Sequence, residues 1–447
     1  MTFIRTYRVE IALAVLALVV HAACFALVIH ANGSVLDAVR ADDGFFELAK
    51  NVLAGNGFSW SAEAPYEPNA MRTPGYSYVL AALIGVVGVA GAALIQMLAA
   101  SAIPILGMKI AEKITASRAI SIGTGVILAL DPTLALLSFQ FYTETLFLIL
   151  FLLWLLLTFR YLERRDALTL ILGAILLGFA ILTRTTVQYI PLLFVPFIFW
   201  QFGRKEWWRG ATHAGVYLLI IGAILTPWVM RNVHEFGVPG LSAQTPFVLY
   251  TNLAPAVLSV AKGSDFNDEV RGFLTPAEYK GDAITLVNGA DYAARAFDVV
   301  YAHPTAAAFV ASKSLFTFFT NDGFYALLAR SGYAPEDFFP LLVAARLAWI
   351  AITLAAFVGA LVYLLTRRSQ LAILIILLVA YFALTSTIAA FGTNPRYRLP
   401  VDPIILALAG IGCAYLFALL RRRTSIWPHK PQLTGTTHRQ NDSHRAR

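Results

Sequence analysis

Charged side chains beside the apolar runs of this sequence are of the types that act on phosphates and hydroxyls. Asp42 and Asp43 lie in the stretch ADDGFF, and Glu144 lies in FYTETLF. Basic and polar residues follow at the ends of later apolar runs: Arg184, Arg231, Asn232, Arg396, Tyr397 and Arg398. Arginine holds phosphate oxygens through a planar fork, and a carboxylate can take or orient the proton of a hydroxyl. This combination suits displacement of the phosphate from a lipid-linked sugar by a hydroxyl acceptor.

Helix caps and lipid contacts are the ordinary alternatives for these residues. Asp42, Asp43 or Glu144 would also fit the first turn of a surface helix. Arginines at helix ends also reach lipid head groups, and Asp131-Pro132 is typical of a helix end. The residues alone leave Asp42 and Asp43 equally eligible as a base.

The turn NPRYRLP, residues 394–400, carries two of the arginines between prolines. Proline restricts its own backbone and that of the residue before it, so we expect a stiff turn. In an extended segment, side chains two residues apart point the same way. We therefore expect Arg396 and Arg398 to hold one phosphate, with Tyr397 on the opposite side.

Long apolar runs must position these residues. The chain has 447 residues, of which 58% are hydrophobic and 13% charged, whereas soluble domains average about a quarter charged. A membrane-spanning helix needs about 20 mostly apolar residues. Ten runs qualify: Val9–Ala31, Ala90–Met108, Ala119–Leu137, Phe141–Phe159, Ala167–Leu182, Val187–Phe202, Ala211–Val229, Leu341–Leu365, Leu371–Phe391 and Val401–Leu420. The sequence thus predicts an all-α polytopic membrane protein with about ten transmembrane helices.

The gaps between the runs predict their orientation. Every second gap is rich in arginine or lysine, and short basic loops stay in the cytoplasm. We therefore expect an inner-membrane protein with both termini in the cytoplasm and the chemistry-bearing residues outside. The net charge of +8 then reflects this bias and not nucleic-acid binding. Counting Gly75–Gly88 as a span would place Lys109 outside, so we interpret it as an interfacial helix.

Two external segments are long enough to fold. The first, residues 32–88, contains apolar residues at helical spacing after Asp43, which predicts an amphipathic helix on the membrane surface. The second, residues 231–340, is moderately polar and predicts exposed helices and loops. Residues 1–423 are expected to form one transmembrane domain, and residues 424–447 a disordered cytoplasmic tail.

Sequence signatures of soluble enzymes are missing. The chain has no G-x-x-x-x-G-K-[ST] phosphate loop, no G-x-G-x-x-G, no H-E-x-x-H and no G-x-S-x-G. A donor held as a nucleotide by a glycine-rich loop is therefore not expected. Cys24 and Cys413 both fall within spans, so neither a disulfide framework nor a cysteine metal site is indicated. No cofactor is assigned, and the residues leave a divalent metal undecided.

An ordered series of motifs resembles a known family, the GT-C membrane glycosyltransferases that use polyprenyl-phosphate sugars. The similarity is to the protein mannosyltransferase and aminoarabinose lipid A transferase group. The matching stretches are DDGFFELAKNVLAGNGFS, RTPGYSYVLAALIGVVG, DPTLALLSFQFYTETLF, GFAILTRTTV, TPWVMRNVHEFG, RAFDVVYAHPTAAAFVASK and NPRYRLPVDP. They follow the family's order as far as about Leu420. The chain departs from it in having Phe45 or Phe46 where tyrosine is common.

The resemblance implies roles for particular residues. A catalytic acid is implied at Asp42 or Asp43, and a second acidic position at Glu144. The implied phosphate-binding residues are Arg396, Arg398, Arg184 and Arg231, and the implied substrate-positioning residues are Arg72, Tyr397 and Asn232. The expected reaction is an inverting transfer of a sugar from polyprenyl phosphate to a glycan, lipid or protein hydroxyl.

Other functional classes stay open at this point. A polysaccharide polymerase or ligase would use a lipid-diphosphate donor and a similar set of residues. A lipid-linked sugar flippase or transporter would need polar groups near the bilayer midplane, whereas the charged residues here gather at the ends of the apolar runs. A non-catalytic scaffold is the remaining alternative.

Overall fold

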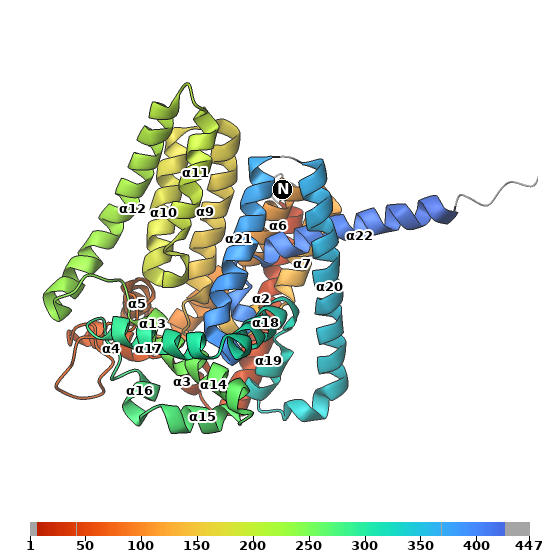
Figure 1. Ribbon diagram of the computed structural model, residues 1–447. Coiled ribbons are helices and arrows are strands. Elements are labelled where there is room, and N and C mark those ends of the chain that lie inside the picture. Colours follow the sequence, from red (N-terminus) through yellow and green to blue (C-terminus); the bar gives the residue numbers. More distant parts are fainter. Residues whose placement is uncertain (1–6, 42, 368, 425–447) are drawn as a thin grey trace, which may run out of the picture.

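The computed structural model describes residues 7–41, 43–367 and 369–424, and the regular elements of this part of the chain are helices (Figure 1). Eight helical stretches in it are long and apolar enough to cross a membrane, and two shorter apolar helices accompany them. These ten elements correspond to the ten predicted runs. The protein is therefore an all-α polytopic membrane protein. The predicted tail lies outside the described residues from 425 onward.

The long helices form two groups that stand side by side in Figure 1. The first group contains α9 (Glu144–Arg164), α10 (Ala167–Thr183), α11 (Ile190–Phe202) and α12 (Trp207–Phe236). The second contains α2 (Arg8–Asn32), α6 (Ile103–Thr115), α7 (Arg118–Ala129), α20 (Phe339–Thr366), α21 (Gln370–Ser386) and α22 (Asp402–Thr424). Contacts between α6 and α9 join the groups.

Buried aromatic side chains hold the first group together. Trp154 of α9 packs edge-on against Phe194 of α11, with ring centroids 6.2 Å apart. Its indole Nε1 also donates to the Tyr217 hydroxyl of α12 over 3.3 Å. Lipid tails are as apolar as this core, so close packing and such hydrogen bonds, rather than water exclusion, favour the association of the helices.

Glycines allow α20 and α22 to cross at close range. A Cβ atom added at Gly359 would lie 1.8 Å from the Leu408 carbonyl oxygen, and one at Gly412 would lie 2.0 Å from that of Ala355. No side chain fits at either position without separating the two helices, a common use of small residues in membranes. This crossing fixes α22, whose first residue directly follows the turn that carries Arg396.

Three helix boundaries differ from the prediction. The third predicted span is two helices, α7 and α8 (Pro132–Leu137), because Asp131 caps α8 by accepting from the Leu134 amide over 2.8 Å. The fourth begins only at Glu144, after a loop at residues 138–143. The second predicted span is divided between the end of α5 (Pro74–Ala100) and the start of α6, whereas the break in α5 at Gly88 (φ +71°, ψ +177°) falls where the predicted interfacial helix ends.

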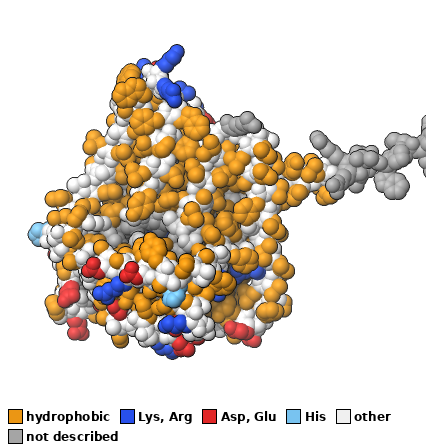
Figure 2. All heavy atoms as spheres, in the orientation of Figure 1, with side chains coloured by type: hydrophobic (Ala, Val, Ile, Leu, Met, Phe, Trp, Pro, Cys, Tyr) orange, Lys and Arg blue, Asp and Glu red, His pale blue; other side chains and the backbone are white. Residues whose placement is uncertain are grey.

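Short helices cover one end of the long ones, as Figure 1 shows at its lower edge. They come from the two predicted external segments. The elements are α3 (Val35–Val39), α4 (Phe45–Ala54), α13 (Gln244–Val248), η2 (Leu249–Leu253), α14 (Ala254–Lys262), α15 (Phe266–Phe273), α16 (Pro276–Lys280), α17 (Gly289–Ala302), α18 (Pro304–Thr320), α19 (Phe324–Arg330) and η3 (Pro335–Phe338). In the view of Figure 2, hydrophobic side chains cover the middle of the molecule, and charged side chains gather near its upper and lower ends. The predicted amphipathic helix is confirmed as α4.

Candidate active site

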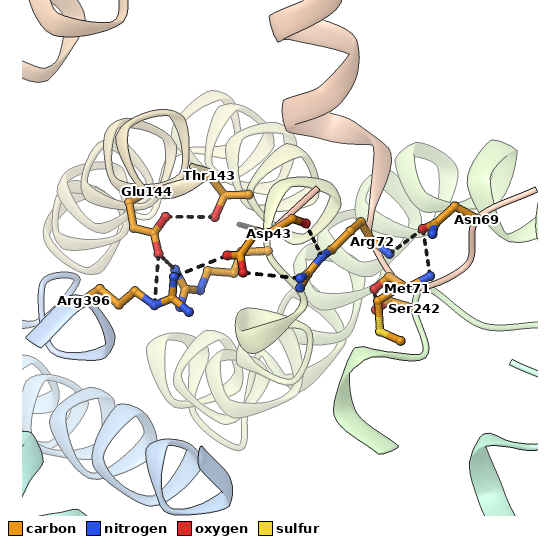
Figure 3. Close-up of polar contacts among 9 residues, drawn as sticks. Asp43, Asn69, Met71, Arg72, Thr143, Glu144, Ser242 and Arg396 are labelled. Carbon is orange, nitrogen blue, oxygen red and sulfur yellow. Dashed lines mark hydrogen bonds and ion pairs between the residues drawn. The ribbon is translucent and has the colours of Figure 1, made fainter. Parts of the chain in front are cut away.

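Five charged residues from distant parts of the sequence meet where the short helices adjoin the long ones (Figure 3). They are Asp43 before α4, Arg72 before α5, Glu144 at the start of α9, Arg184 at the end of α10 and Arg396 before α22. All five are among the site residues predicted from the sequence. Their meeting depends on local contacts that hold each segment in place.

The loop that carries Asp43 is held between aromatic side chains. Gly44 adopts φ +77°, a conformation that glycine tolerates and other residues seldom adopt. The Trp60 ring covers it so closely that a Cβ there would lie 3.0 Å from the ring. Beyond it, Phe45 packs edge-on against Tyr76 of α5, with centroids 5.5 Å apart. These contacts fix the direction in which Asp43 leaves the loop.

Backbone contacts bring the other segments to this loop. The Phe141 amide donates to the Val39 carbonyl oxygen over 2.8 Å, which ties the segment before Glu144 to the end of α3. A Cβ on Gly75 would lie only 2.8 Å from the Leu182 carbonyl oxygen, so the start of α5 lies against the end of α10. Arg72 and Arg184, which flank that contact, are therefore held on the same side.

Asp43 lies between two guanidinium groups, as Figure 3 shows. Its Oδ1 is 3.4 Å from Nη2 of Arg72, and its Oδ2 is 3.4 Å from Nη1 of Arg396. Arg72 Nε also donates to the Asp43 carbonyl oxygen over 3.1 Å. Burial raises the pKa of the Asp43 carboxyl, but the charges of Arg396, Arg72 and Arg184 outweigh it and hold the pKa below its ordinary value. Asp43 is therefore ionised at neutral pH.

Glu144 is the buried acid of the site, with 3% of its side chain exposed. It lies in the first turn of α9, where the helix dipole favours a negative charge. Its Oε1 pairs with Nη1 of Arg184 and lies 3.9 Å from Nε of Arg396. Its Oε2 accepts from the Thr143 hydroxyl over 3.4 Å. Glu144 thus orients two arginines at once.

Arg396 contacts both acids from the short 3-10 turn η5 (Pro395–Tyr397). The Tyr142 and Tyr397 rings lie 5.4 and 5.5 Å from its guanidinium carbon. Burial lowers the pKa of this guanidinium, but the neighbouring Tyr397, Asp43 and Glu144 groups outweigh burial and raise it well above its ordinary value. Its Nε is buried and has no hydrogen-bond partner among the described residues. This Nε faces Glu144 Oε1 at 3.9 Å, which is an ion pair without a hydrogen bond.

These residues line a cavity of ≈ 260 Å³, here called the arginine cavity. Its wall includes Asp43, Arg72, Glu144, Arg184, Arg396 and Tyr397. The remaining polar lining comes from Thr73, Thr143, Thr183, Thr185, Thr186, Gln188, Tyr189, Gln244, Thr245, Tyr381 and Thr385. Three guanidinium groups and two carboxylates leave this cavity with a net positive charge.

A second cavity of ≈ 620 Å³ shares Asp43 and Arg72 with the first. Its lining is rich in aromatic side chains, and we call it the aromatic cavity. The residues are Asp43, Gly44, Trp60, Met71, Arg72, Phe247, Thr251, Asn252, Phe266, Asn267, Val270, Tyr279, Lys280 and Gly392. Asp43 thus lies at the boundary between a cationic cavity and an aromatic one.

Arg398 does not reach either cavity. Its side chain is fully buried, with Nε 2.6 Å from Asp402 Oδ1 and Nη1 donating to the Phe318 carbonyl oxygen over 2.9 Å. The Trp349 ring lies 3.7 Å from its guanidinium carbon. The expectation of an extended turn is wrong, because residues 395–397 form a 3-10 turn. Tyr397 consequently lies with Arg396, and Arg398 lies apart from both.

Arg231 and Asn232 also lie outside both cavities. Arg231 Nη1 donates to the Asn69 carbonyl oxygen over 2.9 Å and to Asn232 Oδ1 over 2.8 Å. Asn232 is fully buried and donates to the Gly240 carbonyl oxygen. Asn69 Oδ1 in turn accepts from the Arg72 amide over 3.2 Å. These two residues support the Arg72 loop from behind. Asp42 lies outside the described residues.

Several lining residues were not predicted from the sequence. Thr183, Thr185 and Thr186 flank Arg184 and bring three hydroxyls to the arginine cavity. The run TRTT at the end of an apolar stretch could have indicated them. Trp60 had no such signal, because its place beside Gly44 follows from the tertiary fold. Within the described residues, no three His, Cys, Asp or Glu side chains group as metal ligands would.

Comparisons with known proteins identify the fold. No protein-family model and no curated protein matches the chain. The oligosaccharyltransferase AglB from Archaeoglobus fulgidus, solved with an inhibitory peptide and a dolichol-phosphate, matches 96% of this chain with a TM-score of 0.53 at 14% identity. The chain spans about half (53%) of that protein's length. At this identity the match shows the fold alone, and it confirms the GT-C-like helical membrane fold.

A second solved structure is less similar. ArnT from Cupriavidus metallidurans bound to undecaprenyl phosphate matches 93% of this chain and 81% of its own length, at 14% identity. Its TM-score of 0.35 is too low to support an argument about this chain.

Proposed function

We propose that the chain transfers a sugar from a polyprenyl-phosphate donor to a hydroxyl acceptor at the external face of the membrane. One observation carries the proposal: two carboxylates and three guanidinium groups surround one cavity and leave it with a net positive charge. The shared fold supports it, because AglB was solved with a dolichol-phosphate, a lipid of this class. The basic loops of the sequence favour the external face.

The phosphate of the donor would bind between Arg396 and Arg184. Both guanidinium groups face the arginine cavity, and Glu144 and the Tyr397 ring keep them in place. Planar guanidinium groups bind phosphate oxygens through paired hydrogen bonds. The negative charge on the leaving phosphate grows as its bond to the sugar breaks, so fixed cations there stabilise the transition state more than the ground state.

Asp43 would act on the acceptor hydroxyl. The hydroxyl oxygen attacks the anomeric carbon, the bond from that carbon to the phosphate oxygen breaks, and polyprenyl phosphate leaves with the bonding electron pair. The hydroxyl proton passes to the Asp43 carboxylate. A single displacement inverts the anomeric configuration.

Donor binding would strengthen Asp43 as a base. In the structure its pKa is lowered by Arg396 and Arg72, which makes it a weak proton acceptor. A phosphate that pairs with Arg396 would neutralise part of that field, and burial would then raise the pKa toward the pH of the reaction. Proton transfer is most efficient when the pKa of the base lies near the operating pH. The site thus favours proton removal only when the donor is present.

Release of undecaprenyl phosphate from undecaprenyl-phosphate sugars tests the proposal whichever acceptor the chain uses. Protein in liposomes is offered a panel of such sugars together with crude cell-envelope glycans. We expect release with at least one sugar, and a loss of about 10²–10⁴-fold in Asp43→Asn. Asp268→Asn is the matched control, because Asp268 is an exposed acid that lines neither cavity.

The neighbouring acid is tested alongside as Asp42→Asn. No release by the wild type with any sugar of the panel would overturn the proposed function. A normal rate in Asp43→Asn would remove Asp43 from the reaction. If only lipid-diphosphate donors were consumed, the polymerase or ligase alternative would replace the proposal.

A further inference from the structure

The lining of the aromatic cavity comes almost entirely from outside the membrane-spanning stretches. Its lining comes from the loop at residues 55–73, from the Asp43 loop and from the short helices α13, η2, α15 and α16. Apart from Gly392 at the end of a span, its lining residues lie outside the membrane-spanning stretches. A ligand of this cavity therefore comes from the aqueous side, whereas a lipid-linked donor remains in the membrane.

The lining combines flat apolar rings with amide groups. Trp60, Phe247, Phe266 and Tyr279 contribute rings, and Tyr279 is 63% exposed. Asn252 adds an amide that can both donate and accept hydrogen bonds. A sugar ring has the complementary surface, with C–H groups on its faces and hydroxyls around its edge. Rings for the faces and amides for the edge are thus the groups that a saccharide requires.

The charge of the cavity selects among water-soluble acceptors. Its charged lining residues are Arg72, Lys280 and Asp43. Arg72 and Asp43 pair with each other, and Lys280 forms no ion pair with another described residue. The net charge is therefore positive, which disfavours a basic peptide and favours a neutral or acidic ligand.

We propose that the aromatic cavity is the acceptor site and that the acceptor is a neutral or acidic saccharide. This inference rests on the proposed function, because it assigns the ligand of the second cavity that reaches Asp43. In a direct displacement the acceptor attacks from the side opposite the leaving phosphate. A carboxylate on the boundary of the two cavities can accept the proton of a saccharide hydroxyl while the donor phosphate lies among the arginines.

Binding to an array of neutral oligosaccharides, acidic oligosaccharides and basic peptides tests the site without any transfer. The full-length protein in detergent is applied as wild type, Tyr279→Ala, Asn267→Ala and Tyr301→Ala. Asn267 is an exposed lining residue, and Tyr301 is 77% exposed on α17 away from the cavity, which makes it the matched control. We expect saccharide binding that weakens about five- to tenfold in Tyr279→Ala and is unchanged in Tyr301→Ala.

Donor chemistry separates this inference from the proposed function. Tyr301→Ala is expected to release undecaprenyl phosphate at the wild-type rate with and without glycan, whereas transfer to the bound saccharide falls in Tyr279→Ala. Binding of saccharides with no donor consumption would contradict the proposed function and leave the saccharide site standing. Saccharide binding that does not depend on Tyr279, absence of saccharide binding, or retention of basic peptides alone would overturn the inference.

Discussion

Asp43 has each of its carboxylate oxygens beside a different arginine, an arrangement that makes it ionised but weakly basic. The second acid, Glu144, is nearly buried and holds Arg184 and Arg396 instead of reaching the boundary between the cavities. The two carboxylates therefore have different roles, although they lie in one cavity. In the proposed reaction, Asp43 would face the acceptor, and Glu144 would organise the cations that hold the leaving phosphate.

The pH dependence of the reaction follows from the charges around Asp43. Its pKa lies below the ordinary 3.8, so the carboxylate is the only form present near neutrality. A carboxyl whose pKa is lower in the folded state than in the unfolded state stabilises the fold at pH values above its unfolded-state pKa. It loses that contribution as the pH falls through its folded-state pKa. A catalytic base follows the same rule, because it is active only in its ionised form. With Asp43 as the base, kcat/KM should be constant from about pH 8 down to about pH 5.

Removing one cation should raise the pH at which kcat/KM begins to fall on the acid side of the profile, here called the acid limb. In Arg72→Gln burial still raises the pKa of Asp43 while one opposing charge is gone, so the limb is expected at higher pH than in the wild type. Profiles of kcat/KM at low donor concentration report the free enzyme and are the measurement of choice. A wild-type limb near pH 6, or identical profiles in the two proteins, would contradict the assignment of Asp43.

Residue types allowed much of the site to be predicted, but not the direction of each side chain. Asp43, Glu144, Arg184 and Arg396 could be named because acids and arginines together at the ends of apolar runs suit phosphate chemistry and fall within the motifs of the resemblance. Arg398 has the same sequence signal as Arg396, yet it lies against Asp402. Asp402 lies only four residues further on, but the Trp349 ring and the Phe318 carbonyl oxygen that bury Arg398 come from distant segments, which local pattern does not indicate.

At the scale of elements, the η5 turn decides which of its residues enter the arginine cavity. The Asn394 side chain accepts from the Arg396 amide over 3.2 Å and begins the turn. Arg398, buried with Asp402 and bonded to α18 through the Phe318 carbonyl oxygen, ends it. Arg398 is therefore a positioning residue: it holds the backbone from which Arg396 and Tyr397 reach the cavity.

Replacing the buried pair should separate positioning from folding. Arg398→Met alone leaves the Asp402 carboxylate unpaired, at a cost of about 3–5 kcal/mol, and should reduce the yield of folded protein. In the double variant Arg398→Met/Asp402→Leu the fold is expected to persist, because well-packed apolar residues often replace a buried ion pair without loss of stability. Its kcat/KM for the donor should still fall about tenfold or more, since the turn is no longer fixed.

Folding and donor use must be measured on the same preparation of that variant. Thermal unfolding in detergent reports the first, and release of undecaprenyl phosphate reports the second. Unchanged donor use in the folded double variant would show that Arg398 has no positioning role.

For the whole molecule, hydropathy allowed the fold class and the ten apolar helices to be predicted. A spanning helix has few alternatives in a chain of this composition. The helix break at Gly88 falls where the predicted interfacial helix ends, whereas the break after Leu130 was missed although Asp131-Pro132 is typical of a helix end. The meeting of five distant segments at one site could be proposed only through the resemblance, since no local pattern indicates which helix ends are neighbours.

The orientation of the molecule can be tested with single cysteines. In a Cys24→Ala/Cys413→Ala background, Ser264→Cys lies on an exposed loop of the second predicted external segment, and Lys205→Cys on an exposed basic loop between α11 and α12. We expect a membrane-impermeant maleimide to label Ser264→Cys in intact spheroplasts and Lys205→Cys only after the inner face is opened. The reverse pattern would place the site in the cytoplasm and remove the basis for a polyprenyl-phosphate donor at the external face.

Donor use by Arg396→Lys tests most directly whether the arginine cavity holds the phosphate of a polyprenyl-phosphate donor. Lysine keeps the charge but loses the planar fork through which Arg396 contacts Asp43 and Glu144 and would bind the phosphate. The control is Arg271→Lys, a conservative change on an exposed surface helix. The account predicts that kcat/KM for the undecaprenyl-phosphate sugar falls at least about tenfold in Arg396→Lys, roughly 1.4 kcal/mol, with normal insertion and no change in Arg271→Lys. Equal kcat/KM in Arg396→Lys and the wild type would contradict it.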